Sequence, residues 1–289
     1  MYKVDNAIIL DAGASSRFAP LSYEMPKGLI TVKGEVLVER EIRQLQEAGI
    51  ENIILVTGYR KEDYQYLAEK FGITLVDNPT YALRNNNGSI YAVKDYLKNS
   101  YICSSDNYFS VNPFEREVEG SYYAAVHAEG ETAEWCMEED EDGFITDVTV
   151  GGSNAWYMLG HVFWDENFSR KFLEILEKEY NLPETADKLW ETIFIEHLQV
   201  FKMKVRHYPK GAIFEFDTLD ELRQFDESYV EDTRSPILKK IARQLYCREG
   251  EIVNIRTVKA HDNRASGCTF TACKASWEYD YETGSLRRL

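Results

Sequence analysis

Short apolar segments alternate with helix-like segments through the first hundred residues, and this alternation constrains the fold more than any other feature. The apolar runs lie at residues 7–10, 53–56, 73–76 and 101–103, and helical spacing of apolar residues lies at 36–48, 61–71 and 88–97. Apolar runs of this length are typical of strands buried on both faces of a parallel sheet. The sequence therefore predicts an α/β fold, with a Rossmann-like, mostly parallel sheet flanked by helices.

Strand signals come closer together in the second half of the chain. They lie at residues 121–127, 134–138, 143–149 and 157–164, before helical segments at 166–180 and 186–197 and strands near 200–208 and 212–216. We expect them to form a mixed or antiparallel extension of the sheet. Thr218, with Glu221 three residues later, predicts the start of a capped helix.

The charge distribution divides the chain near residue 228. The 289 residues have a formal net charge of −16; residues 1–228 contain 22 basic and 41 acidic side chains, against 11 and 8 in residues 229–289. A change of sign of this kind indicates two pieces of protein. We expect a main domain over 1–228 and a small C-terminal appendage, a helix plus strands, over 229–289.

Composition also limits the partners and the location. The acidic excess argues against a nucleic-acid partner, because polyphosphate backbones are held mainly by Lys and Arg. No apolar run is long enough to span a membrane, and a signal-peptide pattern is missing, so we expect no membrane insertion. Five cysteines without a CxxC pair are typical of a reducing compartment, and we expect a cytoplasmic protein.

The segment after the first predicted strand has the strongest chemical signal. It runs DAGASSRFAP from Asp11 to Pro20 and is soon followed by MPKGL. Small residues at the carboxyl end of a parallel strand let backbone N–H groups approach an anion, and Arg17 and Lys27 could both bind phosphate. Neither a Walker A loop nor a GxGxxG fingerprint is present. An ordinary turn with two solvated cations is the alternative, but the joint pattern favours phosphate binding.

Three carboxylates are candidates for holding a cation. Asp106 follows the predicted strand at 101–103, at the sheet edge where ligands bind, and is well placed to hold Mg²⁺. A lone Asp at such a position more often caps a turn. Glu215 and Asp217 are two residues apart in a predicted strand, so we expect both on one face, where they either repel or share a cation. A solvated edge strand is the alternative.

Tryptophans are concentrated in the second half of the main domain. The chain contains 5 Trp among 19 Tyr and 14 Phe, with Trp135, Trp156, Trp164 and Trp190 in this region. Trp faces attract cations, so an aromatic cage for a quaternary ammonium group is one interpretation. Core packing is the other, and composition alone favours it.

These motifs together resemble a known family. AIILxAGxxSRxxPL and MPKGL are similar to the nucleotidyltransferases that activate sugar phosphates and phosphocholine, above all to the bacterial CTP:phosphocholine cytidylyltransferases. The similarity extends over roughly residues 5–228 and continues through NIILVTGY at 52–59, SDNY at 105–108 and IFEFD at 213–217. It implies a nucleotide-diphospho-sugar transferase-like fold and a nucleotidyltransferase catalytic domain over 1–228.

The resemblance also implies a role for each matching residue. Arg17, Lys27, Asp106 and Asp217 would carry catalysis. The nucleotide CTP would contact Ala12, Gly13, Arg17, Lys27, Asn86 and Asp106, with the two cations on its triphosphate and Asn86 near the base or ribose. Mg²⁺ would be held by Asp106 and Asp217. The choline headgroup of phosphocholine would be surrounded by Trp135, Trp164, Trp190 and Glu215.

Three departures from the family pattern leave the base contacts and the headgroup preference open. Asp11 stands where the family usually has Ala, and Ala14-Ser15 stands where it has a second Gly. Asn87-Gly88 replaces aromatic residues that commonly follow the Asn pair.

The expected reaction is Mg²⁺-dependent, in-line transfer of CMP from CTP to phosphocholine, giving CDP-choline and pyrophosphate. The same chemistry on phosphoethanolamine, 2-aminoethylphosphonate or a sugar 1-phosphate is an alternative, and a non-catalytic nucleotide-binding homologue is another. A primary ammonium would favour carboxylates over an aromatic cage, and a sugar would need polar groups where this chain has Trp. Whether the protein is a homodimer is left open.

The appendage has a weaker resemblance of its own. Residues 236–255 weakly resemble the opening of choline/ethanolamine kinase-like domains, which occur fused behind cytidylyltransferases. No kinase catalytic loop follows, and the expected glycine-rich stretch is lost at 260–264. We interpret the tail as a truncated kinase start without kinase activity, or as a helix and hairpin packed on the main domain or across a dimer.

Overall fold

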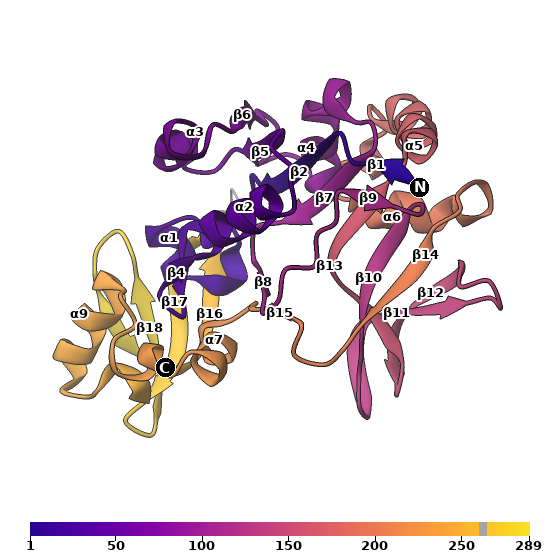
Figure 1. The fold of residues 1–289 in the computed structure, drawn as a ribbon. Helices are drawn as coiled ribbons and strands as arrows, with labels where there is room; N and C mark the ends of the chain where they lie inside the picture. The colour runs from indigo at the N-terminus through magenta and orange to yellow at the C-terminus, as the bar shows by residue number, and fades with distance from the viewer. Residues whose placement is uncertain (260–264) are drawn as a thin grey trace. The chain divides into compact units, whose positions relative to one another are not determined.

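The computed structural model describes residues 1–259 and 265–289 (Figure 1). Contacts between residues divide the chain into two compact units, which we describe in turn. The first unit comprises Met1–Gly13 and Leu37–Glu215, and the second comprises Ala14–Val36 and Phe216–Leu289. The stretch at 260–264, which departs from the glycine-rich kinase pattern, lies outside the described residues.

A parallel sheet forms the centre of the first unit. Its strands lie in the order β7 (Ser100–Ser104), β2 (Asn6–Asp11), β5 (Ile53–Thr57) and β6 (Thr74–Asp77), and all three pairings are parallel. Ile8, Ile9 and Ile54 are completely buried, as expected for strands covered on both faces. The predicted α/β fold is confirmed.

An antiparallel extension continues the sheet on the other side of β7. The extension is made of β10 (Tyr122–His127), β11 (Glu131–Glu139), β12 (Ile145–Ser153) and β13 (Trp156–Trp164). Strand β13 pairs with β7, β10 and β11, and β11 pairs with β12. Strand β14 (Lys204–Tyr208) lies parallel to β10. The sheet as a whole is therefore mixed, as the closer spacing of the strand signals indicates.

Helices flank this sheet. They are α2 (Leu37–Glu47), α3 (Gln65–Phe71), α4 (Asn86–Ala92), α5 (Glu166–Glu179) and α6 (Trp190–Glu196), with 3₁₀ turns η3 (Lys61–Tyr64), η4 (Lys94–Tyr96), η5 (Pro183–Thr185) and η6 (Leu198–Val200). Helix α5 begins at an Asp165 cap, whose carboxylate accepts a hydrogen bond from the Phe168 N–H at 2.9 Å. In the described part of the chain, no helix is both long and apolar enough to cross a membrane.

Two short strand pairs complete the first unit. Strand β1 (Tyr2–Lys3) pairs with β9 (Glu117–Val118), and β8 (Asn107–Phe109) pairs with β15 (Ile213–Glu215). The second pair matters for the site, because β8 begins directly after Asp106 and β15 ends at Glu215.

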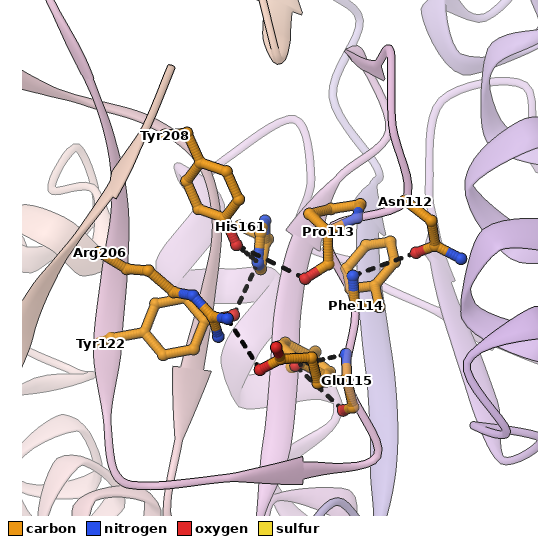
Figure 2. A network of polar contacts seen from close by, with 9 residues as sticks. Asn112, Pro113, Phe114, Glu115, Tyr122, His161, Arg206 and Tyr208 are labelled. Carbon is orange, nitrogen blue, oxygen red and sulfur yellow. Dashed lines mark hydrogen bonds and ion pairs between the residues drawn. The ribbon is translucent and has the colours of Figure 1, made fainter.

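A buried polar network joins β10, β13 and β14 (Figure 2). His161 is completely buried, and its Nε2 lies 2.8 Å from the Tyr122 hydroxyl and 3.4 Å from that of Tyr208. The Arg206 guanidinium lies over the Tyr122 ring and forms an ion pair with Glu115 at 2.8 Å. Burial and the nearby guanidinium lower the pKa of His161 to about 3. The imidazole is therefore neutral at physiological pH.

The second unit combines Ala14–Val36, which we call the entry segment, with the C-terminal residues Phe216–Leu289. Its entry segment contains η1 (Ser16–Phe18), α1 (Leu21–Glu24), η2 (Lys27–Leu29), β3 (Thr31–Val32) and β4 (Glu35–Val36). Its C-terminal part contains α7 (Leu219–Phe225), α8 (Ser228–Glu231), α9 (Pro236–Leu245) and η7 (Glu249–Glu251), then β16 (Val253–Lys259), β17 (Ala265–Ala272), β18 (Ala275–Asp280) and β19 (Leu286–Arg288). Strands β16 to β19 form an antiparallel sheet in chain order.

This division differs from the predicted boundary near residue 228. The Thr31 carbonyl accepts hydrogen bonds from the Tyr229 hydroxyl at 2.7 Å and from Arg234 at 2.8 Å. The Glu24 carboxylate accepts one from the Ile237 N–H at 2.8 Å, at the start of α9. The entry segment is thus held by residues two hundred positions later. Composition does not reveal such a contact, because it averages over neighbours in sequence. The kinase resemblance of the tail stays a prediction.

Candidate active site

The carboxyl end of β2 forms a tight turn. Ala12 is buried, and its carbonyl accepts a hydrogen bond from the Tyr59 N–H at 2.9 Å. A Cβ at Gly58 would lie 2.9 Å from that carbonyl and 2.8 Å from the Tyr81 side chain, so the close approach requires glycine. Gly13, which follows, is exposed and has no such neighbour. The backbone beyond Ala12 is therefore open to solvent, where an anion could reach it.

Arg17, Lys27 and Asp217 meet in the second unit. The Asp217 carboxylate lies 2.7 Å from Arg17 Nη1 and 3.7 Å from Lys27 Nζ. The Arg17 side chain is 75% exposed, whereas that of Lys27 is 5% exposed and its ammonium lies over the Phe18 ring. A buried ammonium is costly without a negative partner, and Asp217 supplies one. Three residues that the sequence assigns to phosphate and metal binding thus lie together.

The expectation that Glu215 and Asp217 share one face of a strand is wrong. Strand β15 ends at Glu215, where it pairs with Asn107 of β8. Asp217 lies beyond the strand, and its N–H donates to Glu221 at 2.7 Å, at the capping box of α7. The strand ends because the chain there turns into a helix, so the two carboxylates belong to different units.

Asp106 lies in the turn between β7 and β8, where its carboxylate accepts a hydrogen bond from the Ser104 hydroxyl at 2.6 Å. Asp106 also interacts electrostatically with Glu41 of α2, a buried carboxyl next to the Cys103 thiol. Burial raises the pKa of Glu41 well above its ordinary value, and the negative charges of Asp106 and Asp11 raise it further. These effects favour the protonated form of the Glu41 carboxyl. Its helical position in the sequence gave no sign of this neighbourhood.

The donor chemistry of Asp106 and Asp217 fits Mg²⁺, which usually takes one or two carboxylates together with substrate phosphates and water. Within the described residues, no group of three or more His, Cys, Asp and Glu could hold a metal ion. The metal role of the two aspartates, one in each unit, stays a prediction.

Trp164 lies inside the core of the first unit. It is completely buried, and its ring centroid lies 4.7 Å from that of Phe172, 5.0 Å from that of Trp190 and 5.1 Å from that of Phe168. This environment is the core packing that composition favours. Its place in a headgroup cage stays a prediction without a contact to support it.

Trp190 lies at the start of α6, beside the amide side chain of Asn86 and the carboxylate of Glu191. Its ring stacks on Tyr123 at 5.8 Å, and its backbone N–H donates to Asn86 Oδ1 at 2.7 Å. Asn86 Nδ2 in turn donates to Glu191 at 3.0 Å, and the Tyr123 hydroxyl donates to the same carboxylate at 3.4 Å. Asn86 thus joins α4 to α6. Its predicted contact with the base or ribose is a further role that this geometry leaves untested.

Glu191 is a candidate site residue that sequence reasoning missed. Burial raises the pKa of this half-buried carboxyl to about 7, while hydrogen bonds from Asn86 and Tyr123 act in the opposite direction. A group that titrates near neutral pH is typical of functional sites. Its one sequence signal is its position directly after Trp190. Tyr123 gave no signal, because it lies within an apolar strand.

Glu215 belongs to the same neighbourhood as Glu191. Burial raises the pKa of Tyr123 strongly, and the charges of Glu191 and Glu215 add to this effect. The pKa of Tyr157 is raised by burial and by Glu134 and Glu215. We call Tyr123, Tyr157, Trp190, Glu191 and Glu215 the acidic aromatic cluster. Trp135, half-buried on β11, neighbours Cys136, which pairs with Tyr157.

Fold and site together define a nucleotidyltransferase: a Rossmann-like sheet, a small-residue turn after its first strand, and two cations beside a carboxylate. The family model of the MobA-like NTP transferase domain matches residues 7–110. Over 221 residues the chain is 34% identical to the choline-phosphate cytidylyltransferase of Streptococcus pneumoniae, a match that covers 76% of this chain and 96% of the relative. The chain belongs to the choline-phosphate cytidylyltransferase family.

Two further matches agree with this assignment. A solved structure of the CTP:phosphocholine cytidylyltransferase from Streptococcus pneumoniae superposes with a TM-score of 0.75, covering 78% of this chain and 99% of that one at 34% identity. A 2-aminoethylphosphonate cytidylyltransferase from Lancefieldella rimae is 32% identical over 234 residues, or 80% of this chain and 95% of the relative. Relatives with different acceptors are therefore similarly close.

Proposed function

We propose that this protein transfers CMP from CTP to phosphocholine and releases pyrophosphate. The convergence of Arg17 and Lys27 on Asp217 carries the proposal, because two cations that lie close together can bind a polyphosphate. The 34% identity to a choline-phosphate cytidylyltransferase, in an alignment that covers 96% of that relative, supports the choice of substrates. All five cysteines are free thiols, which supports the cytoplasmic location.

The reaction needs no protein nucleophile. An oxygen of the acceptor phosphate attacks the α-phosphorus of CTP, the bond to the bridging oxygen breaks in line, and pyrophosphate leaves with the electron pair. Arg17 and Lys27 would exchange Asp217 for phosphate oxygens and neutralise charge that grows on the leaving group. Positioning of the two substrates supplies the rest of the acceleration.

We propose Mg²⁺ as the cofactor, with Asp106 and Asp217 as its carboxylate ligands. The ion would supply positive charge to phosphate oxygens during transfer. The hydrogen bond from Ser104 orients the Asp106 carboxylate for this role.

The acidic aromatic cluster would receive the headgroup. Trp190 and Tyr123 are buried and stacked on each other. The partly exposed ring of Tyr157 and the negative charges of Glu191 and Glu215 would therefore contact the cation. A quaternary ammonium donates no hydrogen bond, so ring faces and diffuse charge suit it better than a single carboxylate.

2-Aminoethylphosphonate is the second candidate acceptor. Glu191 has carboxylate oxygens that could accept hydrogen bonds from a primary ammonium, and one close relative is named for this acceptor. 2-Aminoethylphosphonate would thus need hydrogen bonds to Glu191, whereas phosphocholine would need only its negative charge.

One assay separates these functions. Pyrophosphate release would be measured with CTP or UTP against phosphocholine, phosphoethanolamine, 2-aminoethylphosphonate and glucose 1-phosphate, with Mg²⁺ or with EDTA. We expect the highest kcat/KM for CTP with phosphocholine, and loss of turnover in EDTA. A higher kcat/KM for 2-aminoethylphosphonate would replace the acceptor, and no turnover with any pair would favour the non-catalytic alternative.

A further inference from the structure

Two cysteines 26 positions apart meet in the second unit. Helix α9 ends at Leu245, and Tyr246 adopts a left-handed conformation that turns the chain toward Cys247. Cys273 lies in the two-residue turn that joins β17 to β18, and its Sγ is 3.9 Å from the Leu245 carbonyl. The turn of the hairpin therefore packs against the end of the helix. Cys247 is two residues beyond Leu245, so this packing places its side chain beside the Cys273 thiol, which contributes to raising the pKa of Cys247.

This pair differs from the other three cysteines. Cys103, Cys136 and Cys268 are buried, whereas Cys273 is exposed and Cys247 is partly exposed. Cys247 also lines a cavity of about 1060 Å³, together with Arg243 and Arg248. A small thiol reagent therefore has access to both sulfurs.

We propose that Cys247 and Cys273 form a reversible intramolecular disulfide, with glutathione disulfide or another small disulfide as the oxidant. In the first step the Cys273 thiolate attacks one sulfur of glutathione disulfide, forms a mixed disulfide and releases one glutathione. In the second step the Cys247 thiolate attacks the Cys273 sulfur and releases the second glutathione. The two protein thiols are oxidised, and one glutathione disulfide is reduced to two glutathione thiols.

The surroundings assign the order of the two steps. Exposure makes Cys273 the sulfur that the oxidant reaches first. Burial raises the pKa of Cys247 to about 11, and its neighbours Cys273 and Glu251 contribute to the rise. Cys247 is thus the less reactive thiol, so we expect it to react second, when the mixed disulfide on Cys273 lies beside it.

The bond would join the end of α9 to the β17–β18 turn. Closing the loop between residues 247 and 273 restricts the unfolded chain, so the oxidised protein should unfold at a higher temperature. Reduction would reverse the change.

The test is peptide mapping of the full-length protein. After equilibration with mixtures of glutathione and its disulfide, free thiols are blocked with iodoacetamide, and non-reduced digests are analysed by mass spectrometry. We expect a Cys247–Cys273 cross-linked peptide that dithiothreitol removes, together with a melting temperature several degrees above that of the reduced protein.

Cysteine variants provide the controls. C247S and C273S should lose the cross-link and the melting shift, and C136S, which alters a thiol outside the pair, should keep both. Stable glutathione adducts on Cys273 without the cross-link in wild type would overturn the proposal. So would a cross-link confined to dimers of the chain.

Discussion

Lys27 is a buried cation whose burial is compensated by Asp217. We expect Lys27→Ala to lower kcat for pyrophosphate release about 100-fold or more, because charge on the leaving phosphates loses a partner. The fold should persist, since Asp217 keeps its ion pair with Arg17. Steady-state kinetics and a melting curve test this, with Lys33→Ala, which removes an ammonium over the Phe225 ring, as the control. Wild-type turnover in a folded Lys27→Ala protein would remove Lys27 from the mechanism.

Glu191 should make acceptor binding depend on pH. Its pKa is raised to about 7, so the carboxyl is neutral below that pH and negative above it. Affinity for a cationic headgroup should therefore rise as the pH increases through 7. Because the acceptor phosphate also titrates, the measurement is the difference between the KM profiles of wild type and Glu191→Gln. Two profiles of the same shape would show that Glu191 lies away from the headgroup.

Trp164 should act through stability. It is enclosed by Phe168, Phe172 and Trp190, so Trp164→Ala would leave a large cavity and cost about 3–5 kcal/mol of unfolding free energy. Trp164→Phe should cost less. Urea unfolding measures both, and KM values for the two substrates should change in proportion. A selective rise in the KM for phosphocholine, with little loss of stability, would instead support the cage.

At the scale of elements, the network between β10, β13 and β14 should make stability depend on pH. The pKa of His161 falls from 6.5 in the unfolded chain to about 3 in the folded one, so between these values the unfolded state binds one more proton. Its contribution is fully present above pH 6.5 and is lost as the pH falls toward 3, by about 1.4 kcal/mol per pH unit.

His161→Phe should remove this dependence, although it removes the hydrogen bond between His161 and the Tyr122 hydroxyl and lowers stability at pH 7. Urea unfolding from pH 7 to pH 4 would be compared with that of His127→Gln, a histidine at the end of β10. An equally steep loss of stability in His161→Phe and wild type would assign the pH dependence to other groups.

Elements with local signals were the easiest to predict from the sequence. The capping box from Thr218 to Glu221 is present at the start of α7, because both partners lie within one turn of the chain. The strand predicted at 212–216 ends one residue early, at Glu215. Asp217 therefore lies outside the strand that contains Glu215. The strand ends there because the chain turns into the start of α7, which the alternation of residues at 212–216 does not show.

At the scale of the molecule, residues 229–289 should be required for a functional entry segment. Tyr229 and Arg234 bind the Thr31 carbonyl, and the Ile237 N–H binds Glu24. We expect a 1–228 fragment to lose turnover and to unfold at a lower temperature, because Arg17 and Lys27 belong to the segment that these contacts hold. Tyr229→Phe, which removes one hydrogen bond, should have a small effect. A 1–228 fragment with full turnover would show that the tail is dispensable.

The sequence by itself determined the α/β class and the family, and it predicted phosphate binding at the turn after the first strand. These properties depend on periodicity and on residues close together in the chain, so they can be predicted from the sequence. Tertiary structure alone decided that Arg17 and Lys27 meet Asp217, that Trp164 lies in the core, and that Glu191 titrates near neutral pH. Each depends on burial or on partners far apart in sequence, and only folding brings such groups together.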